Sequence, residues 1–208
     1  MRSTLNIPAR RQRGFTMIEM IGVLSVISIL AALIVPRVFS VITSAKVGSA
    51  GLAVNGIKSA SLMYYGKYGK FGDVGGTTIT NLPFLNYDSA VLMREGFLEK
   101  PLSAPVGLSS SVQLVAAVST ATAASGTNSA YNLDGNSTNP NDAGIASAVL
   151  QVVFYGVTLI EARDLNRSID GDASILAEDT AGHDILGRVK YDFGSAQTGD
   201  VYCYVAHR

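Results

Sequence analysis

Glu19 is the charged side chain whose position in the sequence most clearly suggests chemistry. It is the only charged residue in the apolar run from Phe15 to Val35. A run of this length fits one membrane-spanning helix, which needs about 20 mainly apolar residues. A carboxylate inside such a helix costs a few kcal/mol and requires a positively charged partner. Glu19 therefore predicts a functional site that works by ion pairing.

Oxygen-bearing side chains also recur at short spacing near residue 170. They are Asp164, Asn166, Asp170 and Asp172, with Gly171 available for a tight turn. Calcium loops place such ligands at alternate positions and carry a glutamate at the twelfth. Counted from Asn166, the twelfth residue is Ala177, so the spacing departs from such a loop. We interpret the segment as a helix end with a solvated acidic turn. Calcium is the alternative, and no other cofactor is expected.

The remaining reactive side chains do not form a catalytic arrangement in the sequence. His183 and His207 are far apart, and neither a G-x-S-x-G nucleophile motif nor a phosphate-binding loop occurs. The single cysteine, Cys203, alternates with Val201 and Val205, which indicates a buried strand position. We expect a protein without enzymatic activity.

Charge is unevenly distributed along the chain. Basic and acidic residues number 16 each, but four arginines and no acidic residue lie within residues 1–14. A basic segment before an apolar run predicts a cytoplasmic N-terminus and an exported C-terminal part. The rest of the chain carries more acidic than basic residues, which argues against nucleic acid as the main partner.

The heptapeptide from Arg13 to Glu19, R-G-F-T-M-I-E, resembles the class III signal of type IV pilins and type II secretion pseudopilins. The resemblance covers roughly residues 10–64. It implies cleavage by a prepilin peptidase between Gly14 and Phe15, followed by N-methylation of Phe15. Glu19 becomes the fifth residue of the mature chain, and Pro36 stands where many members have a helix-kinking proline.

The same resemblance implies partners and a location. The partners are the prepilin peptidase/methyltransferase, other pilin or pseudopilin subunits, an inner-membrane assembly platform and an assembly ATPase. The product is a homo-oligomeric filament, in which Glu19 pairs with the amine of a neighbouring subunit's Phe15. Before assembly, the chain is expected to span the inner membrane once, with its C-terminal domain periplasmic or extracellular.

The expected fold class is α+β, with a long N-terminal helix packed on a C-terminal domain that contains a small antiparallel sheet. Four divisions are expected: a cleaved leader at 1–14, a helix at 15–64 that is transmembrane over about 15–36, a connecting region with a short helix at 65–110, and a β-rich domain with one inserted helix at 111–208.

The second half of the long helix should present one face to this domain. The residues that recur at helical spacing are Ile42, Ala45, Ser49, Ala53, Ile57, Ala60 and Tyr64. Pro36 should kink the helix. Gly48, Gly51 and Gly56 either allow local melting during assembly or permit close packing of the helix on the sheet.

Strand and cap signals divide the C-terminal part. The expected strands are Ser111–Ser119, Ala130–Leu133, Ser147–Tyr155, Arg188–Phe193 and Val201–His207. Thr158 and Glu161 form a capping-box pattern that starts the inserted helix, and Gly171 ends it. Asp88 should cap the short helix Ser89–Glu95.

Several functional interpretations remain open. The missing second cysteine favours a pseudopilin, since many major pilins of type IV pili resemble one another in a C-terminal disulfide loop. A surface pilin for adhesion, motility or DNA uptake is the alternative. From another class, a membrane-anchored binding module that never polymerises fits the apolar run. A secretory signal peptide is disfavoured, because the run exceeds the usual length and no A-x-A site closes it.

Overall fold

The computed structural model describes residues 14–71, 73–74, 77–78, 82–116, 129–133, 148–171 and 182–207. The chain divides into two compact units, residues 1–42 and 43–208. Helix α1, Met17–Tyr68, runs through the boundary, so its first part belongs to the first unit and its second part to the second. The expected leader, 1–14, lies outside the described residues except for Gly14.

In its described part, the first unit is a helix with apolar side chains exposed on every side. From Met17 to Ile42 the large apolar side chains keep between 46% and 86% of their surface exposed. The hydroxyls of Ser25 and Ser28 donate to carbonyl oxygens one turn earlier, at 2.8 and 2.7 Å. Serine in an apolar helix is satisfied locally by such bonds. The helix continues without interruption through Pro36, and the kink there stays a prediction.

The second unit is built on a five-stranded sheet. Its strands are β3 Ser109–Ala116, β4 Ala148–Thr158, β5 His183–Asp184, β6 Val189–Asp192 and β7 Thr198–His207. They lie in the order β3-β4-β7-β6-β5, and every neighbouring pair is antiparallel. Helix α2, Leu159–Asp170, follows β4. A small ribbon of β1 Asp73–Val74 and β2 Thr77–Thr78, and a π-helix η1 at Asp88–Met93, precede β3.

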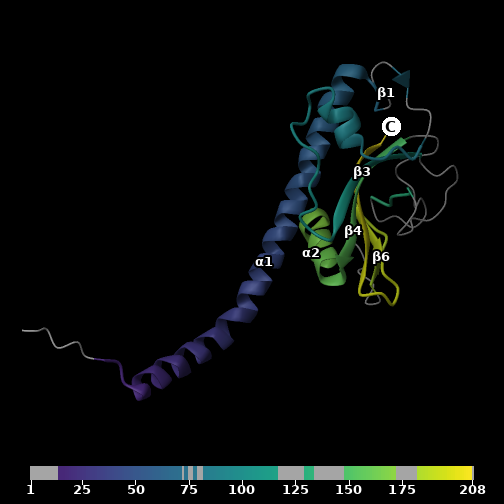
Figure 1. Ribbon diagram of the computed structural model, residues 1–208. Helices are drawn as coiled ribbons and strands as arrows, with labels where there is room; N and C mark the ends of the chain where they lie inside the picture. Colours follow the sequence, from purple (N-terminus) through teal and green to yellow (C-terminus); the bar gives the residue numbers. More distant parts are fainter. Residues whose placement is uncertain are drawn as a thin grey trace, which may run out of the picture. The chain divides into compact units, whose positions relative to one another are not determined.

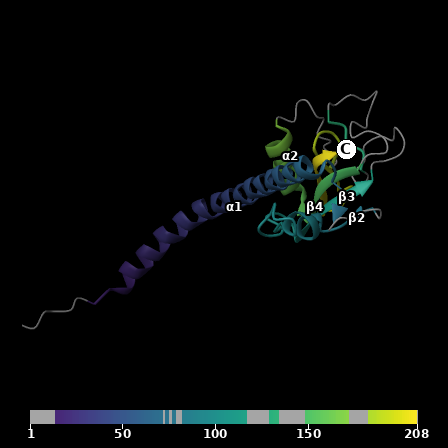
Figure 2. The same ribbon diagram turned by 90° about the horizontal axis from the view of Figure 1, so that it is seen from above.

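One face of the sheet forms the hydrophobic core with the helices. The second half of α1 and helix α2 lie beside β4 in both views (Figures 1 and 2). Ile57 of α1, Leu165 of α2 and Phe154 of β4 belong to one buried cluster. Because side chains alternate along a strand, Gln113 and Gln151 project from the opposite face. The expected α+β architecture with an antiparallel sheet is confirmed.

The buried face of α1 differs from the expected one. Its members are Val47, Ala50, Gly51, Val54, Ile57, Ala60, Ser61 and Tyr64. Ile57, Ala60 and Tyr64 were predicted correctly, whereas Ile42, Ala45 and Ser49 are exposed and Ala53 is half-buried. The larger side chains of Val47 and Val54 bury more apolar surface than alanines do, so they set the rotation of the helix.

Of Gly48, Gly51 and Gly56 in α1, only Gly51 packs closely, and it packs against helix α2 rather than the sheet. A Cβ on Gly51 would lie 3.4 Å from the Ser168 hydroxyl of α2. At Gly48 and Gly56 a Cβ would meet nothing within 4 Å. Close packing therefore accounts for Gly51, and local melting stays a prediction for the other two.

Several local expectations need correction. Ala130–Leu133 forms no strand but a single bridge between Asn132 and Leu186. The two-residue strand β5 was not expected. Asp88 does not cap its helix; its carboxylate accepts a hydrogen bond from the Leu102 N–H at 2.8 Å. The Asp88 carboxylate therefore fixes the segment around Leu102 instead of capping the π-helix.

Candidate functional site

Gly14 and Phe15 lie immediately before α1 and are exposed. The Phe15 side chain keeps 81% of its surface accessible. A Cβ on Gly14 would meet no atom within 4 Å, and its φ is not one that excludes other residues. The chain's own fold therefore does not require glycine at position 14.

Thr16 and Glu19 start α1 with a reciprocal pair of hydrogen bonds. The Glu19 Oε2 accepts from the Thr16 N–H and from the Thr16 hydroxyl, both at 2.8 Å. In return the Glu19 N–H donates to Thr16 Oγ1 at 3.3 Å. This is a capping box, which satisfies backbone donors that the first helical turn leaves free. Sequence reasoning missed it, although the pattern T-x-x-E was visible.

Only one of the two oxygens of the Glu19 carboxylate takes part in this cap. Both bonds from Thr16 end on Oε2, and Oε1 has no hydrogen-bond partner among the described residues. A carboxylate can accept bonds on both oxygens at once. The capping box therefore leaves one oxygen of Glu19 for a cation while it keeps the side chain in place.

By length and composition, α1 is suited to cross a membrane. Its most apolar stretch lies near the N-terminus, and none of that stretch is buried in the protein. A helix that is apolar on all sides is stable in lipid or in contact with other apolar helices. This agrees with a single-pass membrane anchor.

Residues 9–35 match the family model described as the prokaryotic N-terminal methylation motif. The chain carries the prepilin-type cleavage and methylation signal of type IV pilin-like proteins. The long apolar helix followed by an antiparallel sheet is the architecture of this pilin-like class. The motif implies processing by prepilin peptidase and pilin-type assembly, and its family is structural rather than enzymatic. No curated protein and no solved structure matches the chain.

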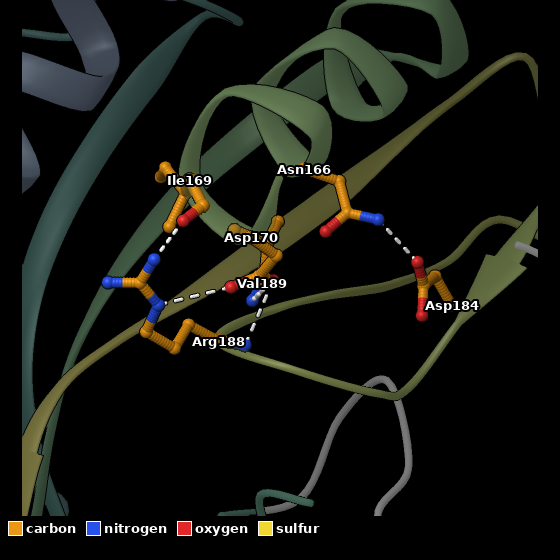
Figure 3. A network of polar contacts seen from close by, with 6 residues as sticks. All are labelled: Asn166, Ile169, Asp170, Asp184, Arg188 and Val189. Atoms are coloured by element: carbon orange, nitrogen blue, oxygen red, sulfur yellow. Dashed lines mark hydrogen bonds and ion pairs between the residues drawn. The ribbon is translucent and has the colours of Figure 1, made fainter. Parts of the chain in front are cut away.

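The calcium candidates contact different partners, as Figure 3 shows for Asn166 and Asp170. Asp170 accepts hydrogen bonds from the N–H groups of Arg188 and Val189, both at 2.9 Å, and from Arg188 Nε at 3.1 Å. Arg188 also donates to the carbonyl oxygen of Ile169. The Arg188 guanidinium therefore neutralises the Asp170 carboxylate, which a bound calcium ion would otherwise do.

The other candidates do not join Asp170. Asn166 donates to the buried carboxylate of Asp184, and Asp164 pairs with Arg167 at 3.4 Å. Asp172 lies outside the described residues. Within the parts of the chain that the structure describes, no three His, Cys, Asp or Glu side chains gather in a way that could hold a metal ion.

The histidines and the cysteine lie apart. His183 pairs with Asp192 at 3.4 Å, and His207 contacts the Tyr204 hydroxyl. Cys203 is completely buried, as its alternation with valines predicted. Burial raises the pKa of its thiol well above the ordinary value.

Sequence reasoning missed a group of polar side chains on the sheet face that points away from the main core. This polar sheet face consists of Gln113, Gln151, Tyr155, Lys190 and Tyr202. The segment Ser129–Leu133 packs on it. Glutamines in the middle of two apolar strands, S-V-Q-L-V and V-L-Q-V-V, were the signal.

Lys190 is the charged residue of this face, and its environment is buried. It is completely buried, its Nζ donates to the Ala130 carbonyl oxygen at 2.7 Å, and the Nζ lies 4.0 Å from the centre of the Tyr131 ring. Burial lowers the pKa of Lys190 to about 7. These contacts hold the segment 129–133 against the sheet.

Proposed function

We propose that this chain is a structural filament subunit, matured by cleavage between Gly14 and Phe15 and by N-methylation of Phe15. The observation that carries the proposal is the methylation motif placed directly at the start of an exposed apolar helix. The chain would be the substrate of the prepilin peptidase/methyltransferase and would have no catalytic activity of its own.

Glu19 would act as the assembly register. Cleavage creates an amine at Phe15, four positions before Glu19, in every subunit. The carboxylate oxygen Oε1, which the capping box leaves without a partner among the described residues, would pair with the amine of a neighbouring subunit. An ion pair away from water is strong only when both charges are present, so uncleaved chains would dock poorly.

The exposed apolar surface of α1 between Met17 and Ile42 would supply cohesion. In the inner membrane this surface contacts lipid, and in a filament it would contact the same helix of other subunits. Packing against protein replaces mobile lipid chains with fixed van der Waals contacts. Pro36 would allow the helix to adjust its direction during this transfer.

Of the two kinds of filament, a type II secretion pseudopilus is our first proposal. It is supported by the single cysteine, because a C-terminal disulfide loop needs two. A surface pilus for adhesion, motility or DNA uptake is the second. In both, an assembly platform and an assembly ATPase would move the subunit out of the inner membrane, with the N-terminus cytoplasmic and the C-terminal domain periplasmic or extracellular.

Mass spectrometry of the native protein's N-terminus tests processing. We expect a mature chain that begins with methylated Phe15. In Gly14→Ala, the full-length chain should accumulate with its fold unchanged, because the added methyl group meets no atom within 4 Å. A native chain that still begins with Met1 would overturn the proposal and favour a membrane-anchored module that never polymerises.

Two substitutions at the start of α1 separate the register from the helix cap. Glu19→Gln keeps an acceptor for Thr16 but removes the charge, and Thr16→Ala removes the cap but keeps the carboxylate. We expect Glu19→Gln to be processed normally but not to be incorporated into filaments. Thr16→Ala should still be incorporated. The amount of each variant in filaments sheared from the cells measures its incorporation. Normal incorporation of Glu19→Gln would contradict the register mechanism without affecting the processing result.

A further inference from the structure

The polar sheet face contains a pocket of about 380 Å³ between β3, β4 and the segment Ser129–Leu133. Its lining residues are Leu82, Pro83, Gln113, Val115, Ala116, Ser129, Gln151 and Tyr202. The volume is within the range of small-molecule sites. None of these lining side chains carries a charge at neutral pH.

Hydrogen bonds fix the two glutamines of the pocket. The Tyr131 hydroxyl donates to Gln151 Oε1 at 2.8 Å, and Gln113 Nε2 donates to the Tyr155 hydroxyl at 2.6 Å. Gln151 Nε2 donates to Gln113 Oε1 at 3.4 Å. Gln113 is 9% exposed and Gln151 4% exposed, so both amides are held almost out of water.

Fixed carboxamides at a pocket wall are specific hydrogen-bonding groups. Each amide nitrogen has two N–H groups and uses one of them in these bonds, so each keeps a second donor. Each amide oxygen has two lone pairs and accepts one bond here. The pocket thus offers donors and acceptors side by side, which is the pattern that vicinal hydroxyl groups match.

Apart from Ser129, the remaining lining is apolar or aromatic. Leu82, Pro83 and Val115 provide aliphatic surface, and Tyr202 provides a ring with a hydroxyl. A charged ligand would lose hydration without gaining an opposite charge from the lining. A ligand with hydroxyl groups on its edge and C–H groups on its face would satisfy both kinds of surface.

Contacts among neighbouring residues fix the lining of the pocket. The Ser129 hydroxyl donates to the Ala116 carbonyl oxygen at 2.6 Å, so these two lining residues are tied together. Lys190 bonds the Ala130 carbonyl oxygen and contacts the Tyr131 ring, and Tyr131 in turn orients Gln151. Preorganisation of this kind reduces the entropy that binding must overcome.

We infer that this pocket binds a neutral saccharide unit. The inference goes beyond the filament proposal and does not depend on it, because every group that carries it belongs to the second unit. The site would allow the domain to recognise an uncharged glycan, whether on a surface or on a transported molecule.

The test uses the full chain in a zwitterionic detergent, because detergents with sugar headgroups would compete. Saturation-transfer difference NMR would be recorded with glucose, galactose, mannose, N-acetylglucosamine, lactose and cellobiose, each up to about 10 mM, the range of weak binding. We expect at least one to show transfer to its ring protons. Glucuronic acid, added as a charged probe, should bind more weakly than its neutral counterpart.

Three substitutions assign the binding to the pocket. Ala116→Arg places a long side chain at the exposed rim, and Gln113→Met removes one amide at similar volume. Each should weaken binding about tenfold, the scale of one or two lost hydrogen bonds. Ser109→Arg is the matched control, since it adds the same side chain at an exposed position of β3 outside the pocket. It should bind like the parent.

Two results would overturn the assignment. One is that no saccharide in the panel binds to the parent chain, including the case in which the peptide mimic N-acetylglycine methylamide binds instead. The other is that saccharides bind equally to the parent, Ala116→Arg and Gln113→Met. Because Ala116→Arg alters only a rim position, it decides the question even if Gln113→Met unfolds.

Discussion

Helices α1 and α2 begin with the same capping box, but the turns that follow it differ. Thr16 and Glu19 cap α1, and Thr158 and Glu161 cap α2, with the same three hydrogen bonds at closely similar distances. Local sequence therefore starts both helices in one way. The residues after each cap decide whether the first turns of the helix pack into a core, as in α2, or stay exposed, as in α1.

The two helices bury different amounts of apolar surface. Helix α2 places Ala162 and Leu165 in the core and exposes the charged side chain of Arg167. The first part of α1 has apolar side chains on all sides and none of them is buried in this chain. Glu161 consequently serves only as part of a helix cap. Glu19 is part of a cap too, but it is also a charged side chain in an apolar stretch of helix.

All nine tyrosines lie at or beyond Tyr64, so tyrosine fluorescence during urea unfolding reports on the second unit alone. The largest expected difference between the two regions is in their cores. Phe154→Ala should lower the free energy of unfolding of the second unit by about 4 kcal/mol, because the side chain is fully buried. Leu24→Ala, at an exposed position of α1, should leave it unchanged. Equal effects would mean that the units unfold together.

Lys190 should make the stability of the second unit depend on pH. The unfolded side chain keeps its proton up to about pH 10.5, and the folded one only up to about 7. Between these values the unfolded state binds more protons, so stability should rise with pH, by about 2 kcal/mol from pH 7 to 9. In Lys190→Met this rise should disappear. A similar rise in both chains would assign it to other groups.

Asp170 should anchor the end of α2 more strongly than Asp164 does. Asp170→Asn should cost about 1.5 kcal/mol, because the nearly buried carboxylate accepts from Arg188 and from two backbone N–H groups. Asp164→Asn removes an exposed pair and should change stability by less than about 0.5 kcal/mol. The two variants remove the same charge from one helix, so equal losses would contradict this account.

The smallest expected difference is between the two caps. Thr158→Ala should destabilise the second unit by about 1 kcal/mol, the usual contribution of a helix N-cap. Thr16→Ala removes the same bonds from α1 and should leave the tyrosine-detected transition where it was. A shift of that transition in Thr16→Ala would show that the start of α1 contributes to the stability of the domain.

Local patterns predicted the parts of the fold that depend on neighbouring residues. The cap at Thr158, the end of α2 at Gly171 and the burial of Cys203 all follow from spacing within a few positions. The motif at Arg13–Glu19 is equally local, and the family model confirms it.

Features that depend on distant residues could not be predicted in this way. Asp170 meets Arg188 across 18 positions, and the pairing of Gln113 with Gln151 depends on the register of two strands. In the second half of α1, alanine, serine and glycine make several faces similarly apolar, so periodicity did not identify the one with Val47 and Val54. Two-residue strands such as β5 are too short to show alternation.

The burial of Cys203 gives the chain a built-in reporter of its own opening. A thiol reacts as its thiolate, and this one is both inaccessible and held in its protonated form. It lies in β7, paired on both sides with β4 and β6, so a labelling reagent should reach it only when the sheet separates. New cysteines introduced on the surface could accordingly be cross-linked one at a time to map the neighbours of a subunit, with no need to remove the native one.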